Sequence, residues 1–207
     1  MPLNDPESPI LVVEDVSHIR ELLEVTLKFK GYPVVSAQNG EEALERIRDK
    51  TPALVIADIL MPRLDGFALA QRLRSQEDTR DLPIILLSAT YITPEDRDFA
   101  MRLGAVKFIE KPVDTEDFLL TVAEILTQGP PDLPAPLDQE AFNEEYRERL
   151  EEKLRHKSNQ ISRIERLLKD LPDTQKPVFT ELLSEARLQR EQIQAELDKI
   201  YAQPGSH

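Results

Sequence analysis

The stretch LVIADILMPRLDGF, residues 54–67, decides how the first half of this chain folds. An apolar run ends abruptly at Asp58, and Met61-Pro62 and Asp65-Gly66 follow it. An unpaired carboxylate is costly to bury inside a strand, so we expect Asp58 where the strand ends and meets solvent or a cation. The Asp65-Gly66 pair predicts a turn into a following helix.

Length and composition narrow the class of protein. The 207 residues allow one or two domains, and a hydrophobic fraction of 40% supports a real core. The absence of cysteine excludes disulfides and thiolate metal sites. A net charge of −13 argues against a general nucleic-acid binder. No stretch is long enough to span a membrane or acts as an apolar signal segment, which predicts a cytoplasmic protein with no membrane partner.

Five short apolar runs alternate with amphipathic stretches as far as residue 126. This alternation predicts a parallel sheet with helices on both faces. Ser17 is predicted to cap the first helix, and Gly31 to end it. The predicted strands are PILVVED, YPVVSA, ALVIAD, LPIILLSA and AVKFIEKP, and the predicted helices span residues 17–30, 40–49, 65–74, 94–103 and 114–126.

A proline-rich segment then changes the character of the chain. Residues 127–139, TQGPPDLPAPLDQ, hold four prolines and little hydrophobicity. Such a composition is typical of a semi-extended linker. We therefore predict a domain at residues 1–127, a linker at 128–138 and a second, all-helical domain at 139–207.

Polar side chains stand at the ends of the predicted strands, where ligands bind in parallel α/β sheets. Strand one ends in Glu14-Asp15, strand three in Asp58, strand four in Ser88 and strand five in Lys111. Three carboxylates that lie close together repel one another unless a cation joins them. Oxygen ligands alone suit Mg²⁺, and a lysine and a hydroxyl beside the metal suit a phosphoryl group.

These motifs resemble the response-regulator receiver domain of two-component signalling, the CheY-like family, over about residues 9–126. The resemblance rests on Glu14-Asp15 after ILVV, on Asp58 before ILMPRLDG, and on LLSAT and FIEKP, all in order. It implies a five-stranded, doubly wound, flavodoxin-like domain. It also implies a phosphoacceptor signalling protein rather than an enzyme, served by a sensor histidine kinase or a phosphotransfer protein.

The resemblance assigns roles to the acidic residues. Asp58 is the phosphoacceptor. Asp15, with Glu14 nearby, holds Mg²⁺ together with Asp58 and the backbone carbonyl of Leu60. Glu14 stands where the family more often has aspartate. Leu60 and Thr90, two residues after the phosphoacceptor and the hydroxyl, take the positions that orient the water that removes the phosphoryl group.

The remaining roles fall on the last two strands. By the resemblance, Ser88 hydrogen-bonds the phosphoryl oxygens and Lys111 pairs with the phosphoryl group, followed by a cis Pro112. Phe108 matches the aromatic switch position. Taken singly, Ser88 is equally a turn hydroxyl, Lys111 a surface charge and Phe108 a core residue. Their joint order favours the site, whereas His18 is better explained as a surface residue.

After the linker, two long charged stretches carry apolar residues spaced alternately by three and four. They span residues 139–171 and 173–202, with LPDTQKP between them. Folding the chain at Pro172-Asp173 brings the two seams together in one antiparallel register, so we predict a coiled-coil hairpin about 45 Å long. The predicted layers are Leu150 with Leu197, Leu154 with Ile193, Ile161 with Ala186, Ile164 with Leu183, and Leu168 with Phe179.

Apolar residues beside the seam predict that two hairpins pair. Tyr146, Leu167 and Leu182 widen the apolar stripe, as in four-helix bundles, which favours a homodimer. The alternative is a monomeric hairpin docked on its own receiver domain. The tail lacks the short helices and the basic face of a helix-turn-helix domain, so we expect protein contacts rather than DNA binding.

His156 keeps an alternative function open, in which the tail is a phosphotransfer hairpin and the histidine carries phosphate. The predicted register places His156 at an outward, exposed position. However, the sequence LRHKSNQ lacks the acidic or asparagine neighbour that follows the phosphorylated histidine in the main type of kinase.

One predicted layer of the hairpin is charged, because Lys157 falls opposite Arg190. Either both side chains extend outward to water, or the layer is a polar device that fixes register and pairing. Glu151 and Glu191 lie within a turn or two and are candidate partners.

Overall fold

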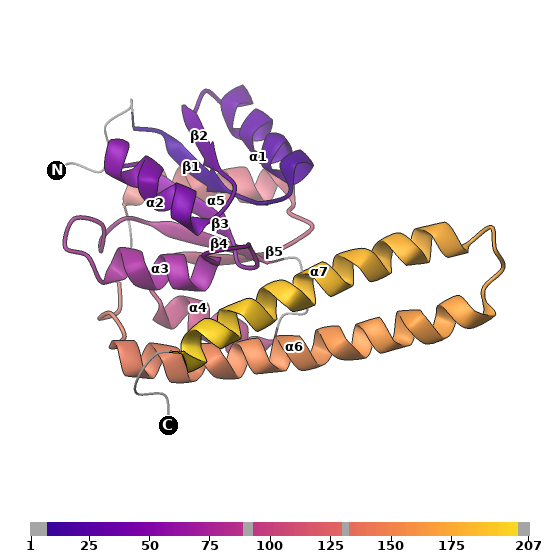
Figure 1. Cartoon of the computed structure of the whole chain (residues 1–207). Helices are drawn as coiled ribbons and strands as arrows, with labels where there is room; N and C mark the ends of the chain where they lie inside the picture. The colour runs from indigo at the N-terminus through magenta and orange to yellow at the C-terminus, as the bar shows by residue number, and fades with distance from the viewer. Residues whose placement is uncertain (1–7, 89–92, 130–132, 203–207) are drawn as a thin grey trace. The chain divides into compact units, whose positions relative to one another are not determined.

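The computed structural model describes residues 8–88, 93–129 and 133–202 (Figure 1). The chain divides into two compact units, Met1–Leu137 and Asp138–His207. Within the described residues, no helix is both long enough and apolar enough to cross a membrane.

The first unit is built on a five-stranded, all-parallel sheet in the order β2-β1-β3-β4-β5. Helices connect the strands and cover both faces, so the predicted doubly wound fold is confirmed. In Figure 1, α2 and α3 lie in front of the sheet and α5 behind it. The strands are β1 (Ile10–Val13), β2 (Val34–Ala37), β3 (Leu54–Asp58), β4 (Ile84–Ser88) and β5 (Lys107–Glu110), and the helices are α1 (Ser17–Phe29), α2 (Gly40–Asp49), α3 (Gly66–Arg74), α4 (Pro94–Arg102) and α5 (Thr115–Gln128).

The central strands are buried on both sides, which explains their continuous apolar sequences. Every residue of β1, β3 and β4 is buried. On one face, Ile10 and Val12 of β1 pack with Leu27 of α1 and with Phe118 and Val122 of α5. This packing makes the strand ends a rigid platform for the polar residues that follow them.

Side chains cap most of the helices in this unit. Asn39 accepts hydrogen bonds at the start of α2, Asp65 at the start of α3 and Asp114 at the start of α5. The prediction for α1 is wrong in one detail. Ser17 is its first helical residue, and Val16 occupies the cap position, with no side-chain hydrogen bond.

The second unit is the predicted antiparallel hairpin, formed by α6 (Gln139–Asp170) and α7 (Lys176–Tyr201). One side of the hairpin is joined by side chains that bridge the two helices. Glu165 of α6 pairs with Arg187 of α7 at 2.7 Å, and the hydroxyl of Tyr201 donates to Glu151 at 2.7 Å. The core that fixes the register contains Ile161, Ile164, Leu183 and Ala186, with Leu168 and Phe179 packed against them.

The charged layer is asymmetric. Lys157 is 4% exposed, and its ammonium donates to Gln160 at 3.0 Å, whereas Arg190 is exposed. Burial lowers the pKa of Lys157. Because the folded hairpin disfavours the charged lysine, its stability rises as pH increases toward the ordinary pKa of lysine. Outward extension therefore describes Arg190 but not Lys157.

We expect Lys157→Leu to raise the free energy of unfolding of the hairpin by about 1–3 kcal/mol, because a leucine fills the seam without a buried charge. Arg190→Leu is the matched control from the same layer and should change it by less than about 0.5 kcal/mol, since Arg190 already meets water. Urea denaturation followed by circular dichroism measures both. A destabilised Lys157→Leu hairpin would show that the ammonium specifies this layer.

Candidate functional site

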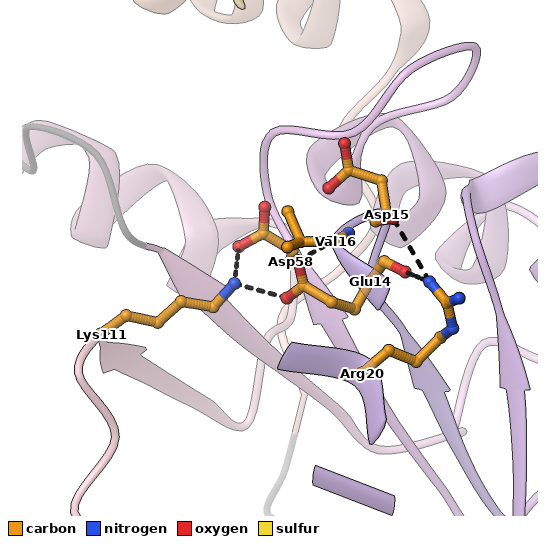
Figure 2. Close-up of polar contacts among 6 residues, drawn as sticks. All are labelled: Glu14, Asp15, Val16, Arg20, Asp58 and Lys111. Carbon is orange, nitrogen blue, oxygen red and sulfur yellow. Dashed lines mark hydrogen bonds and ion pairs between the residues drawn. The ribbon is translucent and has the colours of Figure 1, made fainter. Parts of the chain in front are cut away.

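Neighbouring strands bring the acidic residues together. β1 lies beside β3, with Val13 paired to Ala57, so Glu14 and Asp15 follow β1 next to Asp58 at the end of β3. One carboxylate oxygen from each of Glu14, Asp15 and Asp58 lies within 4.8 Å of the others. Figure 2 shows the three side chains around one point. The three carboxylates that the sequence places at strand ends therefore form one cluster in the structure.

Lys111, which follows the edge strand β5, completes the cluster. Its ammonium donates to Oδ1 of Asp58 at 2.7 Å and also to Oε2 of Glu14 (Figure 2). The backbone amide of Lys111 donates to the carbonyl of Ser88 at 2.8 Å, and the Lys111-Pro112 bond is cis. The lysine is thus tied to both β3 and β4, and its side chain is only 9% exposed.

Burial and charge shift the acid–base equilibria of the cluster. Burial raises the pKa of Asp58 to about 7, the charge of Glu14 adds to the rise, and Lys111 opposes it. Burial and the charge of Glu14 also raise the pKa of Asp15. Burial lowers the pKa of Lys111, but Asp58 and Glu14 outweigh it and give a net rise. The single ammonium of Lys111 therefore leaves part of the negative charge of the three carboxylates unneutralised.

The turn after Asp58 explains the end of the quoted stretch. The Gly66 amide donates to the carbonyl of Ile59 at 2.9 Å, and a Cβ atom at position 66 would overlap the carbonyl oxygen of Asp58. Asp65 then accepts from the amide of Ala68 at 2.8 Å and starts α3. Glycine at position 66 lets the helix begin directly against the carboxylate strand.

Arg20 is a positioning residue that the sequence did not reveal. Its guanidinium reaches back from α1 and donates to the backbone carbonyls of Glu14 at 2.6 Å and Asp15 at 3.3 Å (Figure 2). Helix α1 thereby fixes the backbone of Glu14 and Asp15, which precede it in the chain. An arginine five or six residues after an acidic pair is too common a pattern to have signalled this contact.

The other predicted residues lie around this cluster or outside the described part of the chain. Ser88 is buried at the end of β4. Phe108 is buried in β5, with the guanidinium of Arg97 5.7 Å from its ring centroid. Leu60 is half-buried two residues after Asp58. Thr90 falls outside the described residues.

The two histidines singled out in the sequence lie in different units. His18 is exposed in α1, as a surface residue should be. His156 is half-buried in α6, so its predicted exposure is wrong. The heptad position alone did not show that neighbouring side chains cover this histidine in part.

The donor set fits a hard divalent cation. It consists of carboxylate oxygens, and burial leaves their charge poorly screened. Mg²⁺ is bound through one or two carboxylates, and waters complete its coordination. Glu14, Asp15 and Asp58 can supply such ligands from one side of the cluster.

The match to a family model decides the classification: the model of the response regulator receiver domain aligns with residues 10–123. The chain belongs to the response regulator receiver family. Its members exchange signals with histidine kinases or phosphotransfer partners, and the family generally binds Mg²⁺. Residues 10–123 therefore form a receiver domain of the kind used in two-component signalling.

Curated relatives share the receiver region. The chain is 41% identical to "Response regulator MprA" of Mycobacterium sp. (strain KMS) over 123 residues, 59% of this chain and 52% of the relative. It is 37% identical to "Probable transcriptional regulator ycf27" of Porphyra purpurea over 127 residues, 61% of this chain and 51% of the relative. The chain thus spans about half the length of the curated relatives it matches.

Solved structures show the same receiver fold. The Vibrio cholerae chemotaxis protein CheY4 superposes with a TM-score of 0.54 at 31% identity, covering 57% of this chain and 98% of CheY4. The receiver domain of NtrX from Brucella abortus gives a TM-score of 0.54 at 34% identity, covering 58% of this chain and 99% of that domain.

Proposed function

We propose that the protein is a phosphorylation-activated response regulator in which Asp58 accepts the phosphoryl group. The observation that carries this proposal is the convergence of Glu14, Asp15 and Asp58 on one point, with Lys111 bonded to Asp58. A buried carboxylate at a strand end, beside one cation and two further acids, is poised to bind a metal and to react with phosphorus.

The chain's own groups can carry out the transfer. An oxygen of Asp58 attacks the phosphorus of a phosphohistidine or a small phosphodonor, a new O–P bond forms, and the bond to the donor's leaving atom breaks. Lys111 balances the charge on the phosphoryl oxygens, and Ser88 donates a hydrogen bond to one of them. When bound by Glu14, Asp15, Asp58 and the Leu60 carbonyl, Mg²⁺ would neutralise the charge that develops in this step.

The signal leaves the site through the last strands. Phosphorylation adds about one to two negative charges at Asp58. Ser88 then moves toward the phosphoryl group, and Phe108, which is already buried, repacks into the space. Arg97, which lies over Phe108 and pairs with Glu110 at 3.1 Å, links this movement to the surface of α4 and β5. The phosphodonor in the cell is a sensor histidine kinase or a phosphotransfer protein.

Incubation with acetyl phosphate tests the proposal directly. The purified chain should gain the mass of one phosphoryl group when Mg²⁺ is present and none when EDTA removes it. Hydroxylamine should release the label, as it does for acyl phosphates, and peptide mapping should locate it at Asp58. A label on another residue, or one that forms equally in EDTA, contradicts the assignment.

The phosphoryl group should be lost slowly, because Leu60 offers no hydrogen bond to the attacking water. Leu60→Asn adds such a group and should shorten the phosphate lifetime by about fivefold, the effect of one hydrogen bond of about 1 kcal/mol. Leu60→Met is the control that keeps an apolar side chain. Decay of the label after removal of acetyl phosphate gives both lifetimes, and an unchanged lifetime in Leu60→Asn refutes this role.

We further propose that the chain consists of a receiver domain (1–127), a linker (128–138) and a hairpin (139–207). The hairpin forms a homodimer in the cytoplasm, and it contacts other proteins rather than DNA. The net charge of −13 and the hairpin architecture support this reading. The relatives named as transcriptional regulators extend well beyond the matched region. His156 is half-buried in α6, which does not suit a histidine that a phosphodonor must reach.

Deleting residues 138–207 should convert a dimer into a monomer without phosphate. The receiver unit is compact by itself, and CheY4 is a folded chain that this unit covers almost completely. Light scattering on the full chain and on the shortened chain decides the matter. A full chain that is monomeric at tens of micromolar is incompatible with dimerisation through the tail.

A further inference from the structure

The two sides of the hairpin carry different residues in the half near the turn. Bonds between the helices join Glu165 to Arg187 and Glu151 to Tyr201 on the first side. The other side holds exposed apolar, polar and charged residues, which we call the open face: Gln160, Arg163 and Leu167 of α6, with Val178, Leu182 and Glu185 of α7.

The open face combines exposed apolar residues with unpaired charges of opposite sign. Leu167 is 41% exposed, Leu182 42% and Val178 61%. Arg163 and Glu185 are also exposed, and no ion pair joins either to another described residue. The charges are segregated: the arginine lies on α6 and the glutamate on α7. A surface of this kind is self-complementary if α6 of one copy meets α7 of another.

The register places the complementary residues at matching heights. Ile164 and Leu183 share a core layer, so Arg163 is level with Ser184 and within one residue, about 1.5 Å, of Glu185. By the same register, Leu167 lies within two residues, about 3 Å, of the height of Leu182. A two-fold axis parallel to the hairpin preserves height, and it brings α6 against the second copy's α7.

We propose that the open face binds a second copy of this chain in a four-helix bundle, with both hairpin turns at the same end. Arg163 then meets Glu185 of the second copy, and Leu167 meets Leu182, each twice by symmetry. All four neighbouring helix pairs run antiparallel. This arrangement rests on the proposed dimer and specifies its geometry.

The distribution of charge favours this arrangement. The alternative two-fold axis is perpendicular to the helices and packs α6 of one copy against α6 of the other. It places Arg163 of both copies in that one helix pair, so that like charges share it.

Charge reversal on the open face tests the proposal. In the full-length chain, Arg163→Glu and Glu185→Arg should each raise the dimer dissociation constant by about ten- to a hundredfold, because two attractive pairs become repulsive. Mixing the two variants should restore dimers, since every cross-copy pair is again attractive. Sedimentation velocity measures all three samples, and circular dichroism checks that each variant keeps its helices.

Arg155→Glu and Glu191→Arg are matched controls, because both residues are exposed on the opposite side of the hairpin. They should leave the dissociation constant within about twofold of the original chain, since distant exposed charges contribute little. If the open-face variants dimerise as tightly as the controls, or if mixing restores nothing, this geometry is wrong while dimerisation through the tail stands. A monomeric original chain overturns both, and labelling of Asp58 tests the receiver proposal independently.

Discussion

Asp58→Asn is expected to abolish phosphorylation by acetyl phosphate with Mg²⁺, with no label detectable where the original chain carries one phosphoryl group. The amide removes the nucleophilic oxygen charge but keeps the shape of the side chain. It also removes one candidate ligand of the metal. No other carboxylate can replace it, because Glu14 and Asp15 follow a different strand and point at the cluster from β1.

Glu110→Gln is the control for this experiment, because Glu110 is also a strand-end carboxylate but is exposed and pairs with Arg97. It should keep full labelling. Unfolding does not confound the result. Burial raises the pKa of Asp58 to about 7, so the ionised carboxylate opposes folding above its ordinary pKa. Without Mg²⁺ at pH 8, Asp58→Asn should melt at the same or a higher temperature. Labelling of Asp58→Asn at the original level would move the phosphoacceptor to another residue.

The sequence predicted the elements whose residue pattern has a single structural explanation. Buried parallel strands need apolar residues on both faces, so ILVV, LVIAD and IILLS identified β1, β3 and β4. The hairpin register near the turn followed because folding at Pro172-Asp173 selects one of the alignments that a heptad seam permits. The cap of α1 was missed because Ser17 has the right chemistry but is already helical, and Val16 takes the cap position with no side-chain bond.

The site could be predicted because each of its acids and its lysine ends a strand or follows one within two residues. Strand order then places Glu14, Asp15, Asp58 and Lys111 together without any long-range guess. Contacts made by side chains within helices could not be predicted, because no sequence pattern marks them. Arg20 reaches two backbone carbonyls, and the partial burial of His156 depends on side chains that heptad positions do not describe.

Arg74 is the largest such omission, because it is a buried cation at the end of α3. Its guanidinium donates to the carbonyls of Arg80 at 2.9 Å, Leu82 at 2.8 Å and Gly104 at 2.7 Å. Burial lowers its pKa to about 10, which leaves it charged at neutral pH. The side chain therefore joins α3 to the segment before β4 and to the turn after α4.

Arg74→Ala should lower the free energy of unfolding of the receiver unit by about 3–5 kcal/mol, because three carbonyls lose a charged donor and a cavity opens. Arg72→Ala is the matched control from the same helix turn. Arg72 is exposed, so its loss should cost less than about 0.5 kcal/mol. Chemical denaturation followed by circular dichroism measures both.

Gly104→Ala tests the same contact from its other side. A Cβ atom at position 104 would overlap Nε of Arg74, and the φ angle of 82° is strained for any side chain. The variant should therefore be destabilised by more than 1 kcal/mol, the usual cost of a side chain at positive φ. Because the overlap acts through Arg74, the penalty should shrink when Arg74→Ala is added. Additive losses in the double variant would mean that backbone strain, and not the guanidinium, makes glycine necessary there.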